Sequence, residues 1–439
     1  MNDTLFPLPD ANAPHVEPGT GEPRVQRPNR TQLELRPVDL EALLPADHRA
    51  RVVWEFVEGL DLSALYRAIQ AVEGHAGRPV IDPAILMALW LYATLEGVGS
   101  ARALARLCEE HDAYRWICGG VSVNYHTLAD FRVQHPEVLD GLLTTSVAAL
   151  LAKGVVELTR VAQDGVKIRA SAGGASFRRE ERLSQSLAAA TAQVAVLREQ
   201  LEADPGSMSR REAAARQRVT AERQRRVAEA LAQLPGLEAR RRKAGVKGPA
   251  RLSTTDPDAR VMKMPDGGFR PAFNAQLMTS TQGQIIVGVA MTNAGTDQGE
   301  LHPMVEQVQR RYGRAPTEVL ADGGYVDLDD LRAVAEQGCT VYAPPPGAND
   351  PTRAHRPLWR VDDAIVAEWR HRMGTAVGKA VYRERAATSE CVNALARNRG
   401  LRQLVVRGLQ KARTVLLWFA LAHNVLRAVG LRRAIAMAT

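Results

Sequence analysis

The segments that can form a sheet are split into two groups, and this split constrains the fold more than any other feature. Residues 159–170 alternate in polarity and are rich in β-branched side chains, which predicts a strand. The next such segments, residues 272–279 and 285–291, predict a hairpin around residues 281–283. A single sheet must therefore accommodate a long excursion between its first and second strands.

The excursion, residues 176–255, predicts a pair of long helices joined at a Pro-Gly break at residues 205–206. Its apolar positions are Leu183, Leu187, Ala190, Val194, Leu197 and Leu201 in the first arm, and Val219, Val227, Leu231 and Leu234 in the second arm, residues 210–238. Over residues 176–250, 16 Lys or Arg face 9 Asp or Glu. The charged face of an exposed coiled coil commonly contacts only solvent. The excess of basic over acidic residues here favours contact with DNA instead.

The second group of strands is followed by alternating helices and strands. Helices are predicted over residues 299–312 and 327–337, strands over residues 317–321 and 339–343, and further helices before residue 369 and from residue 385. Together these elements predict an α/β fold with the order of an RNase H-like core, interrupted by a helical-hairpin insertion.

The chain before the sheet is predicted to be all-helical. Asp82 with Pro83, and Ser100, are typical helix starts. The helix after Ser100, the turn at residues 119–120 and a helix over residues 127–132 have the layout of a helix-turn-helix, although such pairs are common in proteins that never touch DNA. The predicted boundaries are a disordered tail (1–31), a helical DNA-binding domain (32–151), the RNase H-like core (152–175 and 256–435) and the basic insertion (176–255).

Three acidic residues stand at places where the predicted fold can bring them together. Asp164 lies on the first strand, Asp322 ends the fourth strand and Glu390 lies on a late helix. Each alone could be structural, as a turn cap or a surface residue. Together they can hold two divalent ions about 4 Å apart, and hard carboxylate ligands favour Mg²⁺, with Mn²⁺ as a substitute.

The sequence around these acids resembles bacterial insertion-sequence transposases of the DDE class, in the branch with a Tyr, Arg, Glu and Lys motif. The stretches that carry the resemblance are residues 164–167 (DGVK), 321–325 (ADGGY) and 382–390 (YRERAATSE), with residues 125–132 (YHTLADFR) in the helical part. The resemblance implies that Asp164, Asp322 and Glu390 are the metal-binding catalytic triad. It also implies that the helical domain contributes to binding the transposon ends.

The resemblance further implies that Tyr382 and Arg385 hold the phosphate at the cut end, as a guanidinium can do with two hydrogen bonds. Arg397 stands where the family motif usually has Lys, seven residues after the glutamate. Four residues separate Arg385 from Glu390 where many relatives have three. Glu384 is the nearest competitor for the third carboxylate, but on a helix it would face away from Glu390.

The expected partners are DNA, as terminal inverted repeats and target DNA, and a second copy of the chain on that DNA, because two element ends must meet before joining. A net charge of +8 agrees with a polyanionic partner. No signal peptide, membrane segment or small-molecule cofactor is expected, and four scattered cysteines favour a reducing cytoplasm. The alternatives are an RNase H-like nuclease and a transposase-derived DNA-binding protein without catalysis.

Overall fold

The computed structural model describes residues 39–72, 74, 79–204, 209–345 and 363–438. The tail expected over residues 1–31 lies outside them. The described chain is helical as far as residue 152 and then forms a mixed sheet with helices, which agrees with the predicted α/β class.

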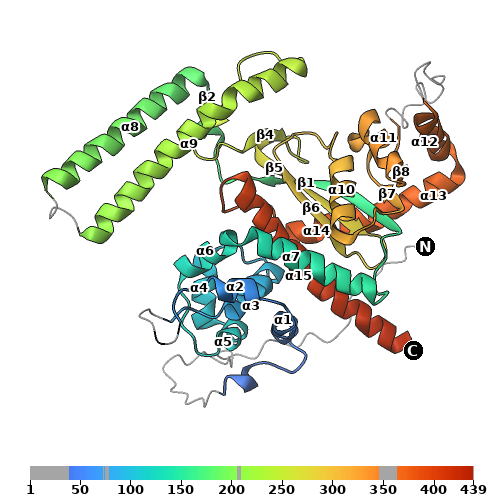
Figure 1. The fold of residues 1–439 in the computed structure, drawn as a ribbon, viewed down its shortest axis with the longest axis horizontal. Coiled ribbons are helices and arrows are strands. Elements are labelled where there is room, and N and C mark those ends of the chain that lie inside the picture. Colours follow the sequence, from blue (N-terminus) through green and yellow to red (C-terminus); the bar gives the residue numbers. More distant parts are fainter. Residues whose placement is uncertain (1–38, 73, 75–78, 205–208, 346–362, 439) are drawn as a thin grey trace, which may run out of the picture. The chain divides into compact units, whose positions relative to one another are not determined.

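Seven α-helices precede the sheet in sequence, and two of them begin at the predicted capping residues (Figure 1). Asp82 accepts a hydrogen bond from the amide of Ala84 at 2.8 Å, and Ser100 accepts one from Ala103 at 3.3 Å. Asn124 caps the sixth helix through the amide of Thr127 at 3.0 Å, so this helix starts earlier than predicted. The helices are α1 (Arg49–Glu58), α2 (Ser63–Arg67), α3 (Pro83–Leu95), α4 (Ala101–Glu110), α5 (Asp112–Cys118), α6 (Tyr125–Gln134) and α7 (Pro136–Ala152).

The main sheet has antiparallel and parallel halves that meet at its central strand, β1. This strand pairs antiparallel with β5 and parallel with β7, and β7 pairs parallel with β8. Strands β4 and β6 pair with successive parts of β5. The six strands are β1 (Arg160–Arg169), β4 (Arg260–Lys263), β5 (Phe269–Ser280), β6 (Ile286–Thr292), β7 (Glu318–Leu320) and β8 (Thr340–Tyr342). Five match the predicted strands, whereas β4 was not predicted.

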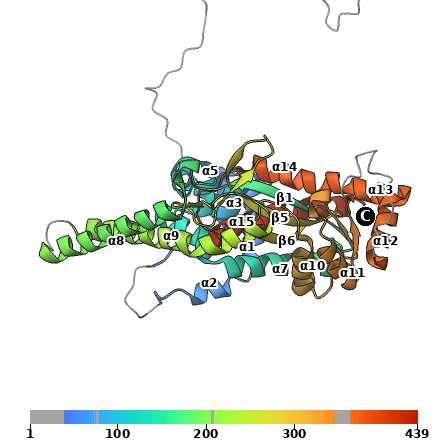
Figure 2. The same cartoon turned by 90° about the horizontal axis from the view of Figure 1, so that it is seen from above.

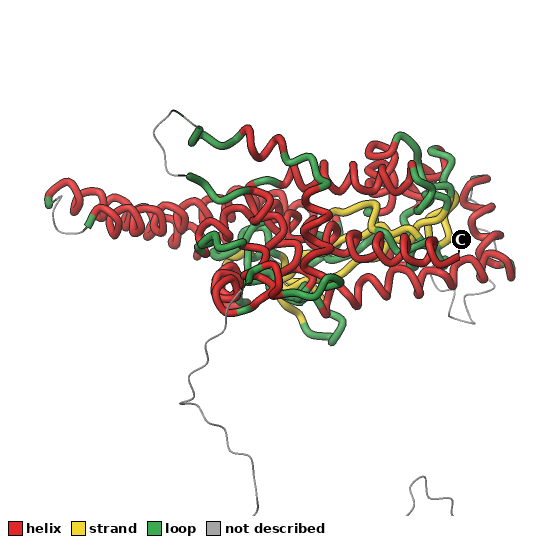
Figure 3. The backbone as a smooth tube through the Cα atoms, turned by 90° about the horizontal axis from the view of Figure 1, so that it is seen from below, coloured by secondary structure: helices red, strands yellow, loops and turns green. Residues whose placement is uncertain are grey.

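Helices lie on both sides of this sheet (Figure 3). The later elements are α10 (Leu301–Tyr312), α11 (Leu328–Glu336), α12 (Ala364–Gly374), α13 (Ala376–Arg385), a π-helical turn (Ala386–Glu390), α14 (Cys391–Asn398) and α15 (Leu409–Ala438). Adjacent residues of a strand point to opposite faces of a sheet. Side chains of β1 therefore meet two different sets of helices, and this decides what surrounds each candidate residue.

Two long helices, α8 (Glu180–Ala203) and α9 (Arg210–Lys243), lie side by side in both views (Figures 1 and 2). Leu183 and Ala190 of α8, and Val227 and Leu234 of α9, are buried. Val219 is 68% exposed, but it lines a hollow between the two helices together with Val196 and Leu197 of α8, so it faces α8 as predicted without being buried. The short strands β2 (Phe177–Arg178) and β3 (Leu252–Ser253) pair antiparallel and join the two ends of this segment.

Helix α15 packs against α3, α7 and β6, and it joins the helical part of the chain to the sheet. The indole of Trp418 donates to the carbonyl of Arg132 at 2.9 Å, and Asn424 forms hydrogen bonds with both backbone groups of Ile286. By length and composition, Leu409–Arg432 is the one helix among the described residues that could cross a membrane, whereas no membrane segment was expected from the sequence. Of its most apolar window, 67% is buried in the fold, as in a core helix.

Candidate active site

The parallel pairing of β1 with β7 places two of the predicted acids at equivalent positions. The last paired residues are Ala162 and Leu320. Asp164 follows Ala162 by two residues, and Asp322 follows Leu320 by two residues. Because the strands run in the same direction about 4.8 Å apart, the two aspartates lie side by side just after the end of β7.

Asp164 is held by groups from the late helices. Its Oδ2 atom accepts a hydrogen bond from the side-chain amide of Asn393 at 2.9 Å and lies 3.5 Å from Nη1 of Arg385. Burial raises its pKa to about 6, against the opposing effect of Arg385, and the like charges of Asp322 and Asp297 raise it further. A buried carboxylate with other carboxylates near it is therefore present on the central strand.

Asp322 has a structural contact as well as a place near the other acids. Its Oδ1 atom accepts the amide of Gly324 at 2.7 Å and so caps the short 3₁₀ turn Gly323–Tyr325. This contact fixes the direction of the carboxylate after the strand. Its charge acts on both Asp164 and Arg385.

The third predicted acid, Glu390, ends a π-helical turn. This turn, Ala386–Glu390, follows α13 without a break and leads directly into α14. Thr388 and Ser389 within it are buried, and their hydroxyls donate to the carbonyls of Glu384 and Arg385. A π-helical turn accommodates one residue more than an α-helical turn. The four-residue spacing between Arg385 and Glu390 is therefore accommodated locally.

Arg385 joins two of the acids. Its Nη2 atom lies 3.0 Å from Oε1 of Glu390, while Nη1 approaches Asp164. Burial lowers the pKa of this guanidinium, but Tyr382, Asp164 and Asp322 outweigh burial and raise it. Arg385 also lies over the ring of Tyr382, 5.7 Å from its centroid. Arg385 therefore contacts two carboxylates and an aromatic ring, and the charge of a third carboxylate, Asp322, acts on it.

The opposite face of β1 carries a second polar group of residues. An added Cβ at Gly165 would lie 2.4 Å from Oδ1 of Asp297, so this carboxylate occupies the space beside the glycine. The same oxygen accepts hydrogen bonds from the side-chain amides of Asn274 and Gln276, both at 2.7 Å. Gln276 in turn accepts the hydroxyl of Tyr325. Burial, followed by Asp297, Asp164 and Asp322, raises the pKa of this tyrosine.

The site therefore matches the expected convergence of carboxylates only in part. Glu390 meets Asp164 through Arg385 and not directly, because the guanidinium lies between the two carboxylates. Among the described residues, no group of three His, Cys, Asp or Glu side chains could hold a metal ion as they stand. Asp164 and Asp322 nevertheless supply the hard oxygen donors that divalent cations prefer, at a place where like charges raise the pKa of Asp164.

Two other motif residues lie apart from the acids. Arg397 is exposed on α14. Glu384, the competing glutamate, forms an ion pair with Arg160 at 2.6 Å, and Arg160 also binds Glu318 at 2.5 Å. Arg160 thus connects α13 to strands β1 and β7 and helps to hold the Arg385 helix against the sheet.

Asn393 and Asp297 were not predicted from the sequence. Asn393 follows Glu390 by three residues, a spacing that puts two helical residues on one face, so its position could have been noticed. Asp297 lies in the connection between β6 and α10, where an acid commonly serves as a helix cap. Nothing local distinguishes it from such a cap.

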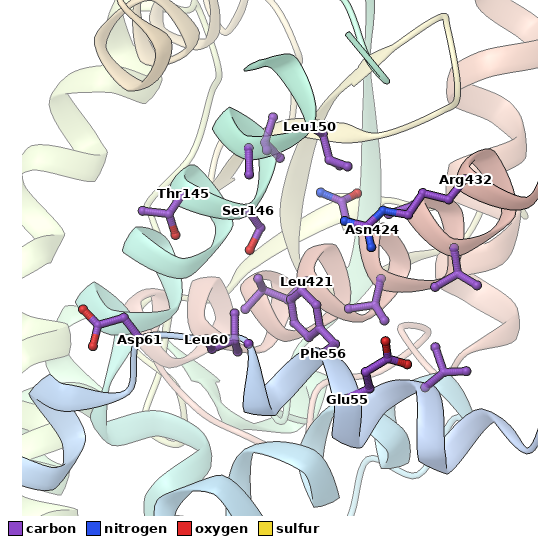
Figure 4. Close-up of a pocket in the computed structure, with 17 residues that line it drawn as sticks. Glu55, Phe56, Leu60, Asp61, Thr145, Ser146, Leu150, Leu421, Asn424 and Arg432 are labelled. Atoms are coloured by element: carbon purple, nitrogen blue, oxygen red, sulfur yellow. The ribbon is translucent and has the colours of Figure 1, made fainter. Parts of the chain in front are cut away.

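A cavity of about 480 Å³ lies elsewhere, between α1, α7 and α15 (Figure 4). Apolar side chains such as Phe56, Leu150 and Leu421 line it, with Glu55 and Arg432 among the polar lining residues. None of the three predicted acids lines it. This cavity is therefore separate from the site that contains Asp164 and Asp322.

Comparison with known families matches both parts of the chain. Residues 38–134 match the family described as Transposase domain (DUF772), and residues 339–429 match the Transposase DDE domain. The second match includes Tyr382, Arg385, Glu390 and Arg397, whereas Asp164 and Asp322 precede it. No curated protein matches the chain.

Proposed function

With a transposase domain near its start and a transposase DDE domain near its end, the chain belongs with the insertion-sequence DDE transposases, and we propose that it cuts and joins DNA at the ends of an insertion sequence. The proposed catalytic residues are Asp164, Asp322 and Glu390. The observation that carries this proposal is the contact of Arg385 with both Asp164 and Glu390, which links the first strand to the late helix of the matched domain.

The order of the strands supports an RNase H-like catalytic core. A central strand with an antiparallel hairpin on one side and two parallel strands on the other is the arrangement of β6, β5, β1, β7 and β8. Helices α8 and α9 then form an insertion after the first strand. We assign residues 32–151 to end binding, residues 152–175 and 256–435 to catalysis, and residues 176–255 to the insertion.

DDE transposases generally use divalent metal ions, and we propose two Mg²⁺ ions here, replaceable by Mn²⁺. When bound, the ions would activate the attacking water or 3′-hydroxyl and stabilise the leaving oxygen. Asp164, Asp322 and Glu390 would hold them. The carboxylates therefore serve as ligands and not as proton carriers.

Arg385 and Tyr382 would position the DNA. The guanidinium already lies between Asp164 and Glu390, so moving it toward a phosphate would free both carboxylates and keep the cation at the site. Arg397, exposed on α14, would add a further phosphate contact. The partners are the terminal inverted repeats and the target DNA, bound by a homodimer in the bacterial cytoplasm.

The test uses the full chain and DNA that contains the element's own flanking sequences. Cleavage and joining are measured in Mg²⁺ and in Mn²⁺ for the wild type, Asp322→Ala and Glu390→Gln, with binding of the DNA ends measured in parallel. We expect both variants to lose cleavage by more than about 1,000-fold while binding changes by less than about threefold.

Two other outcomes would replace this proposal. If the wild type and both variants bind the ends alike and none cuts, the chain is a DNA-binding protein derived from a transposase. The separation of Glu390 from Asp164 by a guanidinium is the observation that favours this alternative. If the wild type cuts but never produces joined DNA, it is an RNase H-like nuclease.

A further inference from the structure

The face of β1 opposite Asp164 is organised around one carboxylate. Oδ1 of Asp297 lies where a side chain at position 165 would begin, 2.4 Å from an ideal Cβ. Gly165 lies in a regular strand pair and does not have a positive φ. A glycine is therefore required here because a larger side chain would not fit, and not because of a special backbone conformation. An alanine at this position would also approach the side-chain amides of Gln276, at 2.9 Å, and Asn274, at 3.1 Å.

This carboxylate is bound by the neighbouring strand. Gln276 is the ladder partner of Gly165 and Asn274 is the partner of Lys167, so both amides project from β5 on the same face. Each donates to Oδ1 of Asp297 at 2.7 Å. Asp297 therefore ties the β6–α10 connection to the strand pair.

The network continues to the residues beside both proposed catalytic aspartates. Oε1 of Gln276 accepts the hydroxyl of Tyr325, three residues after Asp322, and the amide of Gln163, one residue before Asp164. Gln163 and Tyr325 are both fully buried. Gln276 is thus the shared contact between the strand of one aspartate and the turn that follows the other.

We propose that Asp297 is a positioning residue that holds the Asp164 strand and the Asp322 turn in register with each other. The proposal rests on the catalytic roles proposed above for those two aspartates. Asp297 acts from the face opposite Asp164, whose carboxylate contacts Arg385 and Asn393. It fixes Gln276 by accepting its amide, and Gln276 then presents Oε1 to Tyr325.

The first experiment compares Asp297→Ala and Asp297→Asn in the full chain. Alanine removes the acceptor, whereas asparagine keeps an acceptor oxygen and loses only the charge. We expect Asp297→Ala to lower kcat by roughly 100-fold with KM for end DNA changed by less than about threefold, and Asp297→Asn to recover to within about tenfold of the wild type. The matched control is Asp266→Ala, an exposed turn aspartate paired with Arg270.

The second readout does not depend on catalysis. Hydrogen exchange of residues 322–326 is measured without DNA or metal, and we expect Asp297→Ala to accelerate it by roughly tenfold while Asp266→Ala has no effect. Unchanged exchange in Asp297→Ala overturns the proposal. So does an Asp297→Asn variant as inactive as Asp297→Ala, because the charge would then matter more than the hydrogen bonds.

A milder variant covers the case in which Asp297→Ala fails to fold. Tyr325→Phe removes one hydroxyl and keeps the ring, and we expect it to accelerate the same exchange. Combined with Asp297→Asn, its effect should be less than additive because both act through Gln276. Full additivity would contradict the proposed network. If the wild type itself does not cut DNA, the proposed function fails, while these exchange measurements still decide the role of Asp297.

Discussion

Nη2 of Arg385 lies 3.0 Å from Oε1 of Glu390, although the two residues are five positions apart. In an α-helix, five positions rotate a side chain about 140° away from its starting direction. The π-helical turn Ala386–Glu390 removes this difference and returns Glu390 to the side of Arg385. π-helical turns of this kind are frequent at functional sites, and here the turn determines whether the two motif residues meet.

The π-helical turn leads to a prediction about length. Deleting Ala387, whose side chain is exposed, would leave Arg385 and Glu390 four positions apart, which also shares one face in an α-helix. We expect this deletion to retain more than about a tenth of the cleavage rate, because the face is preserved. Inserting one alanine after Ala387 should reduce the rate by more than about 100-fold, because six positions rotate Glu390 away. Single-turnover cleavage measures both, and equal loss in the two variants would contradict the prediction.

Asp164 gives a prediction about pH and stability in protein kept free of metal with a chelator. Folding raises the pKa of Asp164 from its ordinary value of 3.8 to about 6, chiefly through burial. Its protonated form is therefore favoured in the folded protein, and this contribution is full below pH 3.8 and is lost as pH rises through about 6. The free energy of unfolding falls by at most about 3 kcal/mol over this pH range.

Asp164→Asn removes this titration. We therefore expect the variant to unfold at a higher temperature than the wild type at pH 8 and at about the same temperature at pH 4. Thermal unfolding followed by circular dichroism between pH 4 and pH 8 measures the difference. A variant that is less stable than the wild type at pH 8 would show that the contacts of Asp164 outweigh its burial.

Asn393 is expected to matter for catalysis through Asp164. Its side chain is 5% exposed, and its amide donates to Oδ2 of Asp164 at 2.9 Å. We expect Asn393→Ala to slow cleavage by about tenfold and to reduce stability by about 1 kcal/mol, as for the loss of one hydrogen bond. Asn393→Asp should be slower still, because it places a second negative charge beside Asp164. Asn398→Ala, at an exposed position of the same helix, is the control for both rates and for end binding.

The long helices give a prediction about where DNA is bound. Residues 236–251, around the end of α9, contain six Lys or Arg and one Asp or Glu. Residues 191–220 contain five Lys or Arg and four Asp or Glu. Arg240, Arg242 and Lys243 are exposed there, and Arg211, Arg216 and Arg218 are exposed near the start of α9. We expect glutamine at positions 240, 242 and 243 to weaken DNA binding. The slope of the logarithm of the binding constant against the logarithm of the salt concentration should become smaller by about two to three.

The same three substitutions at positions 211, 216 and 218 serve as the matched control. They remove equal charge from a segment whose net charge is close to zero. Affinity for end DNA measured over a series of salt concentrations compares the two variants. Equal effects would show that the whole length of α9 contributes, and the localisation of charge would have no consequence for binding.

Five of the six strands of the main sheet, and the helix starts at Asp82 and Ser100, followed from the sequence alone. A strand buried on one face repeats every two residues and a helix every three to four, so residues 159–170 and the segments after residue 270 could be assigned from their own side chains. Capping at Asp82 and Ser100 is equally local, because each side chain bonds an amide two or three residues away. The three acids could be placed on their strands and helix in the same way, whereas the roles of Tyr382, Arg385 and Arg397 came only from the resemblance to a transposase family.

Tertiary structure alone decided which of these residues meet. Asp164 and Asn393 are 229 positions apart, and their contact depends on how α14 packs against β1. The π-helical turn, the place of Arg385 between two carboxylates and the position of Asp297 beside Gly165 depend on the same packing. Val219 shows the limit from the other side, since its spacing predicted that it faces α8, and the structure leaves it 68% exposed there. The spacing of apolar residues in the sequence indicates which face of a helix or strand a residue occupies. The distance between residues on two different elements is determined only when the whole chain packs.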